Sequence, residues 1–429
     1  MLYFATIAAP VLGFLVQQGG APAHLATRHA AAAPVMAISP TETAPIAGVN
    51  TMSVVTEGPS PTAVLAKDKL YKGKELPPVL GGIKVGTRRI VVVTGASSGL
   101  GLWSAKALAD RGDYFVVCAV RNPKKMDEVA KEIGLKKNDY IAMQLELGSL
   151  QSVKDFVSNL RAFIPARPLN HLICNAAVYR PADPEPAWTD DGYEMSVGVN
   201  HLGHFLLAQL LLPELKRAKG ARVCVVGSIT GNSNTIGGGF VYPRADIGEL
   251  DGLKAGPYGA AMVDGKGFDG AKAYKDAKAL NMMTVTELHR RFHDETGITF
   301  SSMYPGCIAE TNLFREKRQW FRKIFPVFMK YVTGGYVSEK EAGERLAQVI
   351  WDPQCTKSGV YWSWNGNAQQ LGVMKQTKDE ETGKIKYEVQ GSGGSGGEIF
   401  ENQFSGMIQD KRRAKLVYDY SLDAVKDFL

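Results

Sequence analysis

Blocks of apolar and polar residues alternate along the chain from Arg89 onward, and they predict a regular succession of strands and helices. Short apolar runs rich in β-branched residues, typical of buried strands, occupy residues 89–93, 114–120, 140–145, 171–174, 223–226 and 300–304. Amphipathic stretches between them predict helices that end near residue 111 and that cover 124–133, 150–163, 201–217 and the region around residue 274. We therefore expect an α/β fold, a Rossmann-like doubly wound parallel sheet with helices on both faces.

A glycine-rich turn, TGASSGLG, joins the first predicted strand to the first predicted helix. Backbone N–H groups at a helix start bind the pyrophosphate of a dinucleotide, and glycine allows the close approach. An ordinary turn is the alternative, because a chain with 46 glycines contains such strings by chance. The flanking strand and helix favour a nicotinamide-cofactor site formed by Gly95, Ser97, Ser98, Gly99, Leu100 and Gly101.

The end of the second predicted strand indicates which nicotinamide cofactor binds. An acid at this place would bond the ribose 2′-OH of NAD, whereas a basic residue accommodates the 2′-phosphate of NADP. Arg121 stands there and Lys125 follows, while Asp113 lies at the opposite end of the strand. The sequence thus predicts NADPH, with a solvated basic turn as the alternative.

The motif YKDAK places Tyr274 and Lys278 four residues apart, on one face of a predicted helix. The ammonium group is expected to lower the pKa of the phenol from about 10, so that Tyr274 exchanges a proton near neutral pH. A YxxxK string alone is more often a surface pair. The dinucleotide turn earlier in the chain favours a catalytic pair.

Composition narrows the function classes only modestly. With 429 residues and 45% hydrophobic content, the chain is able to bury a large core. Its net charge of +7 is dispersed, which argues against a nucleic-acid partner and leaves an anionic membrane surface open. Five cysteines without a CxxC pair predict reduced thiols, and we expect neither a disulfide framework nor a metal site.

Residues 1–80 differ from the rest of the chain. They begin with an apolar run to Val16, continue rich in Ala, Pro, Ser and Thr, and contain only Glu42 and Glu57 as acids before Asp68. The apolar run is too short for a comfortable membrane span, and the part near Arg28 resembles a transit peptide. We expect a bipartite plastid-targeting leader, with a plain disordered leader as the alternative.

Several longer strings resemble light-dependent protochlorophyllide reductases, a family of short-chain dehydrogenases. The strings are CNAAVYRP, VNHLGHFLL, GSITGN, GFDGAKAYKDAK, HRRFHDETGITF, YPGCIAET and SGVYWSWN. The resemblance covers residues 84–365 and resumes at 400–403, within a single predicted reductase domain at 84–429. Residues 366–398, which contain QGSGGSGGE, are interpreted as a flexible, solvent-exposed insertion.

The resemblance implies a light-driven trans reduction of the C17=C18 double bond of protochlorophyllide to chlorophyllide. Hydride would pass from nicotinamide C4 of NADPH to C17, and a proton would reach C18 from Tyr274, with Lys278 as its activator. The protein's contribution would be positioning, since the reacting atoms must lie within roughly 3.5 Å.

The resemblance also implies roles for individual residues. On the cofactor it places Asn175, Ala176, Glu146, Leu147 and Thr311, with Glu146 standing where the family usually has Asp. Asn200 is expected to support Lys278 through water, and Ser228 to steady the substrate or the tyrosine. Tyr304 and Cys307 are expected beside the pigment, where Cys307 is either a second proton route or a packing thiol.

Two further segments are candidates for the substrate region. Ser228 precedes Tyr274 by 46 positions (274 minus 228), and the long insertion, including 246–268, is either a lid at the active-site mouth or an irregular loop. Residues 315–332 form a basic amphipathic pattern that would cover the tetrapyrrole, lie on plastid membrane lipids, mediate self-association with pigment and NADPH, or face the core. A stromal protein peripheral on the thylakoid membrane is therefore expected.

Two other functions remain as alternatives. The first is a dark-active short-chain dehydrogenase that acts on a ketone or alcohol. The second is a pigment-binding or NADPH-sensing scaffold with a vestigial catalytic motif. The long insertion argues against the first, and the complete set of Asn200, Ser228, Tyr274 and Lys278 argues against the second.

Overall fold

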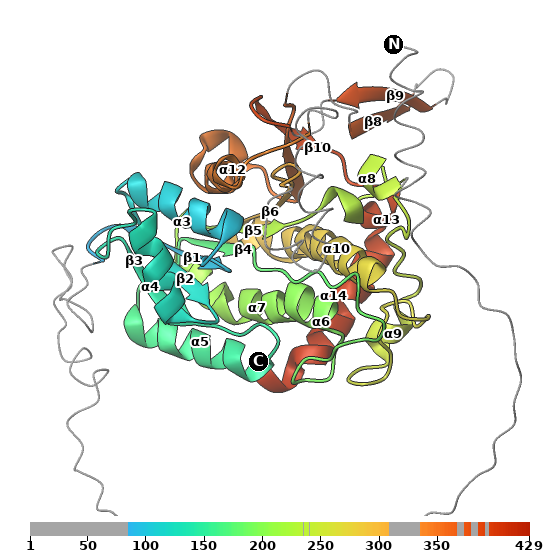
Figure 1. Ribbon diagram of the computed structural model, residues 1–429, viewed down its shortest axis with the longest axis horizontal. Coiled ribbons are helices and arrows are strands. Elements are labelled where there is room, and N and C mark those ends of the chain that lie inside the picture. Colours follow the sequence, from blue (N-terminus) through green and yellow to red (C-terminus); the bar gives the residue numbers. More distant parts are fainter. Residues whose placement is uncertain are drawn as a thin grey trace, which may run out of the picture. The chain divides into compact units, whose positions relative to one another are not determined.

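The computed structural model describes residues 85–234, 236–239, 241–308, 335–366, 373–378, 385–390 and 394–429. Within these ranges an eight-stranded sheet has the order β10-β7-β6-β5-β4-β1-β2-β3 (Figure 1). Its strands are β1 (Arg89–Thr94), β2 (Tyr114–Val120), β3 (Tyr140–Gln144), β4 (His171–Cys174), β5 (Arg222–Val226), β6 (Thr299–Met303), β7 (Val360–Trp364) and β10 (Ile399–Asn402).

All neighbouring strands pair in parallel except β10, which runs antiparallel to β7. The strand order reverses direction at β1, which pairs with β2 on one side and β4 on the other. This confirms the predicted doubly wound sheet. In such sheets ligands bind beyond the carboxyl ends of the strands, at the point where the order reverses.

Helices cover both faces of the sheet (Figure 1). The longer helices are α3 (Gly99–Asp110), α4 (Pro123–Glu132), α5 (Leu150–Phe163), α7 (Gly203–Lys216), α10 (Gly270–Thr296), α12 (Glu339–Trp351) and α14 (Lys411–Val425). The shorter ones are α6 (Met195–Val197), α8 (Ile236–Gly239), α9 (Asp251–Lys254), α13 (Gly406–Gln409), the π-helical turn η1 (Gly198–Leu202), and the 3-10 turns η2 (Ile229–Gly231), η4 (Pro353–Thr356) and η5 (Lys426–Phe428).

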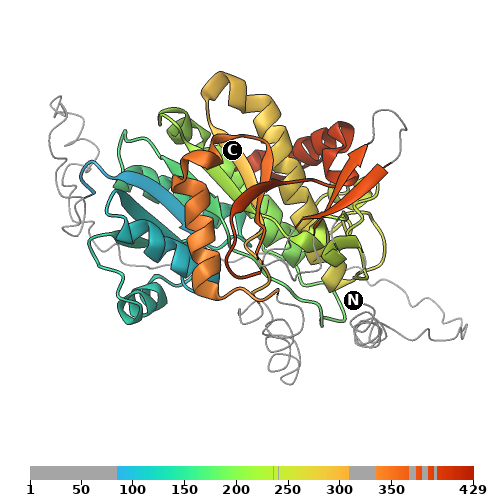
Figure 2. The same cartoon turned by 90° about the horizontal axis from the view of Figure 1, so that it is seen from above.

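Successive residues of β1 face opposite layers, because side chains alternate across a strand. Ile90 and Val92 belong to a hydrophobic cluster with α5, α7, α10 and α14. Val91 and Val93 belong to a second cluster with α3, α4 and α12. Figure 2 shows α12 lying in front of the sheet on this second face. Burial on both faces explains why the strands are continuous apolar runs.

The stretch Met195–Lys216 is long and apolar enough to cross a membrane by length and composition. In its most apolar window 83% of the residues are buried within the protein. Its apolar side chains, among them Leu202, Leu206 and Leu211, pack in the first hydrophobic cluster. This segment is therefore a buried core segment of the α/β fold.

Part of the segment 366–398, interpreted from the sequence as a flexible, solvent-exposed insertion, has regular structure. Strands β8 (Val373–Lys378) and β9 (Ile385–Gln390) pair antiparallel. The apolar residues of these two strands flank a polar stretch, which is a hairpin pattern. Just beyond them, Arg345 of α12 donates hydrogen bonds to the carbonyls of Gly394 (2.6 Å) and Gly396 (2.7 Å). A buried guanidinium thus holds the glycine-rich end of the segment.

Three predictions fall on residues outside the described ranges. They concern the leader at 1–80, Thr311 beside the cofactor, and the amphipathic pattern at 315–332. All three stay predictions.

Candidate active site

The glycine-rich turn between β1 and α3 is shaped for an anionic ligand. Gly95 and Gly99 have φ angles of +68° and +55°, a region that favours glycine. A Cβ on Gly101 would lie 2.4 Å from the carbonyl oxygen of Gly95, so only glycine fits there. No side chain caps the N-terminus of α3 at Ser98, and its first turn contains no acid. A dinucleotide pyrophosphate fits a helix start of this kind.

The end of β1 is tied to the segment after β4 by Thr94. Its hydroxyl accepts hydrogen bonds from the backbone N–H groups of Asn175 (2.8 Å) and Ala176 (3.0 Å). The Asn175 amide donates in turn to the Thr94 carbonyl at 2.9 Å. The predicted cofactor residues Asn175 and Ala176 therefore lie against the glycine-rich turn.

A buried imidazole completes this connection. His204 Nδ1 lies 3.0 Å from the Asn200 carbonyl, which only accepts, and Nε2 lies 2.8 Å from the Thr94 hydroxyl. The proton is therefore assigned to Nδ1, and the Thr94 hydroxyl donates to Nε2. Burial lowers the pKa of His204 to about 4, which keeps the ring neutral. Sequence reasoning missed Thr94 and His204 as site residues, although TGASSGLG and VNHLGHFLL contain them.

The predicted 2′-phosphate region lies at the ends of β2 and β3. Arg121 is 68% exposed, and its Nε lies 3.9 Å from Glu146 Oε2. Glu146 also accepts a hydrogen bond from the Gly148 N–H at 3.0 Å, which turns the carboxylate toward its own backbone. Lys125 is exposed in the first turn of α4. Leu147 is 5% exposed, and its side chain packs in the core. A cofactor contact at Leu147 would therefore use its backbone.

The YKDAK pair lies in α10, whose N-cap is Asp269, and faces the carboxyl end of β5. Lys278 Nζ donates to the Val226 carbonyl at 2.7 Å and lies 5.8 Å from the Tyr274 ring centroid. Burial lowers the pKa of Lys278 to about 8. Ser228, two residues beyond Val226, is a hydrogen-bond partner that lowers the pKa of Tyr274. The structure thus brings Ser228, Tyr274 and Lys278 together.

The expectation that Lys278 makes the Tyr274 phenol acidic is wrong for this structure. Burial raises the pKa of Tyr274 above its ordinary value of 10, the neighbouring Tyr179 raises it further, and the Ser228 hydrogen bond offsets only part of the shift. The ammonium group of Lys278 does not control the pKa of Tyr274, because its Nζ lies 5.8 Å from the centre of the Tyr274 ring and donates a hydrogen bond to the Val226 carbonyl. Tyr274 is therefore a neutral phenol at physiological pH.

The expected water-mediated support of Lys278 by Asn200 stays a prediction, and the described contacts of Asn200 lie elsewhere. Its side chain accepts from the Val178 N–H (2.8 Å) and donates to the Val178 carbonyl (3.0 Å). Its own carbonyl accepts from His204 and from the Asn281 amide (3.0 Å), which uses both lone pairs. Asn200 instead fixes the segment after β4, where the Tyr179 ring lies 4.9 Å from the Tyr274 ring. Sequence reasoning missed Tyr179, which CNAAVYRP contains.

Tyr304 and Cys307 follow the end of β6, beside the same group. Burial raises the pKa of Tyr304 well above its ordinary value, and ionisation of the neighbouring Cys307, Tyr361 or Tyr274 would raise it further. Cys307 is half-buried, and burial raises the pKa of its thiol to about 12. The Cys307 side chain is therefore a protonated thiol, which argues against a thiolate nucleophile.

Comparison with known proteins identifies the family. A model described as short chain dehydrogenase matches residues 89–243. Protochlorophyllide reductase B, chloroplastic, of Hordeum vulgare is 54% identical over 300 residues, which cover 69% of this chain and 75% of the relative. Protochlorophyllide reductase A, chloroplastic, of Arabidopsis thaliana is 53% identical over 306 residues, with 70% and 75% covered.

The relative from Oryza sativa subsp. japonica named protochlorophyllide reductase A, chloroplastic, aligns over a longer stretch. It is 50% identical over 346 residues, which cover 79% of this chain and 81% of the relative. Among solved structures, NADPH-bound carbonyl reductase from chicken fatty liver aligns with 20% identity and a TM-score of 0.48, over 66% of this chain and 99% of the other. Identity above 50% across most of both chains shows that this chain belongs to the protochlorophyllide reductase family of the short chain dehydrogenases.

Proposed function

We propose that this protein is a light-driven, NADPH-dependent oxidoreductase that reduces the C17=C18 double bond of protochlorophyllide to chlorophyllide in the chloroplast. One observation carries the proposal. The dinucleotide turn follows β1, and Ser228, Tyr274 and Lys278 lie at the carboxyl end of β5, two strands away in the same parallel sheet, in a chain that is 54% identical over 300 residues to a chloroplastic protochlorophyllide reductase.

The site has groups suited to hold NADPH. The uncapped start of α3 and the glycines at 95, 99 and 101 fit its pyrophosphate. Arg121 and Lys125 offer positive charge for a 2′-phosphate, and the ion pair of Arg121 with Glu146 is long enough to be exchanged for that contact. Asn175 and Ala176 would line the adenine side of the cofactor. When bound, NADPH supplies the hydride of the reduction.

Tyr274 is suited to give a proton because its phenol stays protonated. Its raised pKa keeps the hydroxyl neutral until charge develops on the substrate, and the Ser228 hydroxyl is in place to stabilise the phenolate that is left. Lys278 carries its charge at neutral pH and sits on the same helix face. We assign Tyr274 the proton to C18, with Ser228 and Lys278 supporting it.

Tyr304 and Cys307 would form part of the pigment-contacting wall. Both follow β6, and Tyr304 lies close enough to Cys307 and Tyr274 for ionisation of either to raise its pKa. A protonated thiol at Cys307 offers packing and a weak hydrogen-bond donor. We therefore assign Cys307 to pigment positioning and leave Tyr274 as the proton donor.

Absorbance spectra of the purified protein with NADPH and protochlorophyllide, taken before and after a flash, test this function. We expect a product red shift only after light, and no shift with Tyr274→Phe. Turnover of a carbonyl substrate in darkness would replace the proposal with an ordinary short-chain dehydrogenase. Pigment binding without conversion would replace it with a scaffold.

The proposed location is the stromal side of the thylakoid membrane. Residues 1–80 would act as the plastid leader, residues 84–429 as one reductase domain, and 315–332 as the contact with anionic lipid or with a second copy. Charge reversal of Arg322 and Lys323 should then weaken binding to anionic liposomes. Unchanged partitioning would remove the membrane contact.

A further inference from the structure

The YKDAK motif contains two charged residues that the proposed chemistry does not use. Lys275 and Asp276 lie between Tyr274 and Lys278, and they are only 4% and 0% exposed. Burying a charge is costly unless it is paired and hydrogen-bonded. Since helix positions are about 100° apart, these two side chains point away from the face of the catalytic pair. Their partners therefore indicate a separate role.

The partners of Lys275 belong to the insertion that separates Ser228 from Tyr274. Lys275 Nζ donates to the carbonyl of Val241 at 2.9 Å and to that of Pro243 at 2.5 Å. A buried ammonium group thus gathers two backbone carbonyls of one short turn. The side chain of Val241 is 44% exposed and that of Tyr242 is 62% exposed, so this turn also presents apolar surface.

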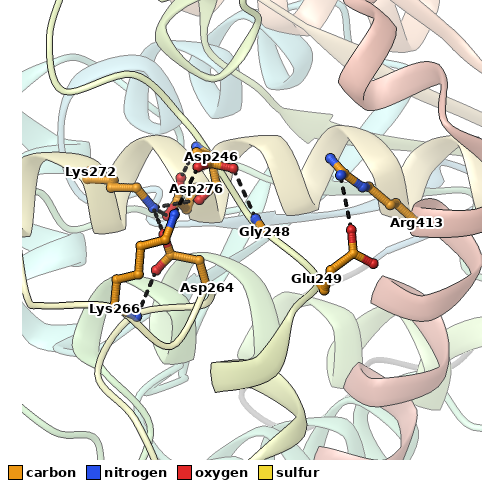
Figure 3. A network of polar contacts seen from close by, with 8 residues as sticks. All are labelled: Asp246, Gly248, Glu249, Asp264, Lys266, Lys272, Asp276 and Arg413. Atoms are coloured by element: carbon orange, nitrogen blue, oxygen red, sulfur yellow. Dashed lines mark hydrogen bonds and ion pairs between the residues drawn. The ribbon is translucent and has the colours of Figure 1, made fainter.

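Asp276 fixes the next part of the insertion. Its Oδ1 accepts from the Asp246 N–H at 2.8 Å, and its Oδ2 lies 2.6 Å from Lys272 Nζ (Figure 3). Lys272 also reaches Asp264 Oδ2 at 3.0 Å. Lys266, at the exposed edge of the network, bonds to Asp246 at 3.3 Å and lies 3.4 Å from Asp264.

The same network therefore joins the two sides of the insertion to one turn of α10. The insertion leaves the sheet beside Ser228 and re-enters the fold at the start of α10, about one turn before Tyr274, so both of its ends lie close to the catalytic group. A displacement of α10 would move the insertion with it, because buried ion pairs and backbone hydrogen bonds connect them. Glu249, farther along the insertion, is also bonded to Arg412 and Arg413 of α14.

We infer that Lys275 and Asp276 are positioning residues that fasten the insertion 241–266 to the catalytic turn, so that the mouth of the pigment site and the Tyr274–Lys278 pair keep one fixed geometry. The inference rests on the proposed function for the identity of the pigment. The YKDAK motif then has two tasks: its outer residues serve the reaction, and its inner residues hold the wall of the site.

Lys275→Met and Asp276→Asn test this inference, with Lys254→Met as the matched control. Lys254 is an exposed lysine of the same insertion, so its replacement makes the same chemical change away from the network. We expect faster amide hydrogen exchange across 241–266 in both test variants. We also expect a KM for protochlorophyllide raised roughly tenfold to a hundredfold, with the Kd of NADPH unchanged. The control should match the wild type.

Two further variants distinguish loss of the network from general misfolding. Lys275→Arg keeps donors for both carbonyls and should restore most of the exchange protection. Lys266→Ala removes only a side chain that is 68% exposed, and should give a smaller increase in exchange around residues 246–264. Wild-type exchange and wild-type KM in Lys275→Met and Asp276→Asn would overturn the inference. If the wild type itself fails to convert the pigment, the proposed function fails, while the exchange experiment still decides whether the insertion is fastened.

Discussion

Replacing Lys278 with methionine should change how the stability of the protein depends on pH. Lys278 is 2% exposed, and burial lowers its pKa from 10.5 to about 8. A shift of that size corresponds to about 3 kcal/mol of unfavourable free energy for holding the ammonium group in the folded protein. Methionine has a similar length and carries no charge, so the variant lacks this cost at every pH.

The sign follows from proton binding. Between pH 8 and 10.5 the unfolded chain keeps the proton of Lys278 while the folded protein has lost it. Stability rises with pH wherever the unfolded state binds more protons, so this group adds about 3 kcal/mol across that window. Buried thiols act in the opposite direction, because burial raises the pKa of Cys174 and Cys307 to about 12. The difference between wild type and variant cancels the contribution of Cys307, while that of Cys174 cancels only in part because the Lys278 charge acts on its pKa.

Urea unfolding of wild type and Lys278→Met at several pH values from 7 to 10.5 provides the measurement. The wild type minus variant difference in unfolding free energy should rise by about 3 kcal/mol over this range. The variant also leaves the Val226 carbonyl without its donor, which adds a constant offset of about 1 to 3 kcal/mol that does not depend on pH. A difference that stays flat between pH 8 and 10.5 would refute the depressed pKa of Lys278.

Three other changes test the cofactor site and its support. Gly101→Ala should abolish NADPH binding and cost about 1 to 3 kcal/mol, because its Cβ would lie 2.4 Å from a backbone oxygen, whereas Gly406→Ala meets nothing within 4 Å and should be neutral in the same titration and melt. Arg121→Ala should weaken NADPH about tenfold in a fluorescence titration; an equal loss for NADH would count against a 2′-phosphate contact. Asn200→Ala should lower the unfolding free energy by about 2 kcal/mol because the backbone of Val178 loses two partners, and a change below about 0.5 kcal/mol would contradict this role.

Local signals in the sequence predicted most of the sheet. The bounds of β2, β4 and α5 were predicted to the residue, because buried parallel strands are continuous apolar runs and α5 has a clear helical period. The cofactor turn was equally accessible, since its glycines are required by backbone geometry within a few residues. By contrast, β7, β10, α12 and α14 were not predicted as elements. The hairpin of β8 and β9 was missed because the neighbouring glycine-rich composition dominated the interpretation.

The sequence by itself determined the family, the nucleotide turn and the spacing of Tyr274 and Lys278, because each depends on residues that are neighbours along the chain. Only the tertiary structure decided what those residues do electrostatically. Burial from several elements raises the pKa of Tyr274 and lowers that of Lys278, and a carbonyl at the end of β5 takes the ammonium group. For the same reason, the sequence did not predict that Lys275 and Asp276 hold the insertion. Desolvation and long-range pairing depend on which distant segments the fold brings together, and periodicity along the chain does not encode them.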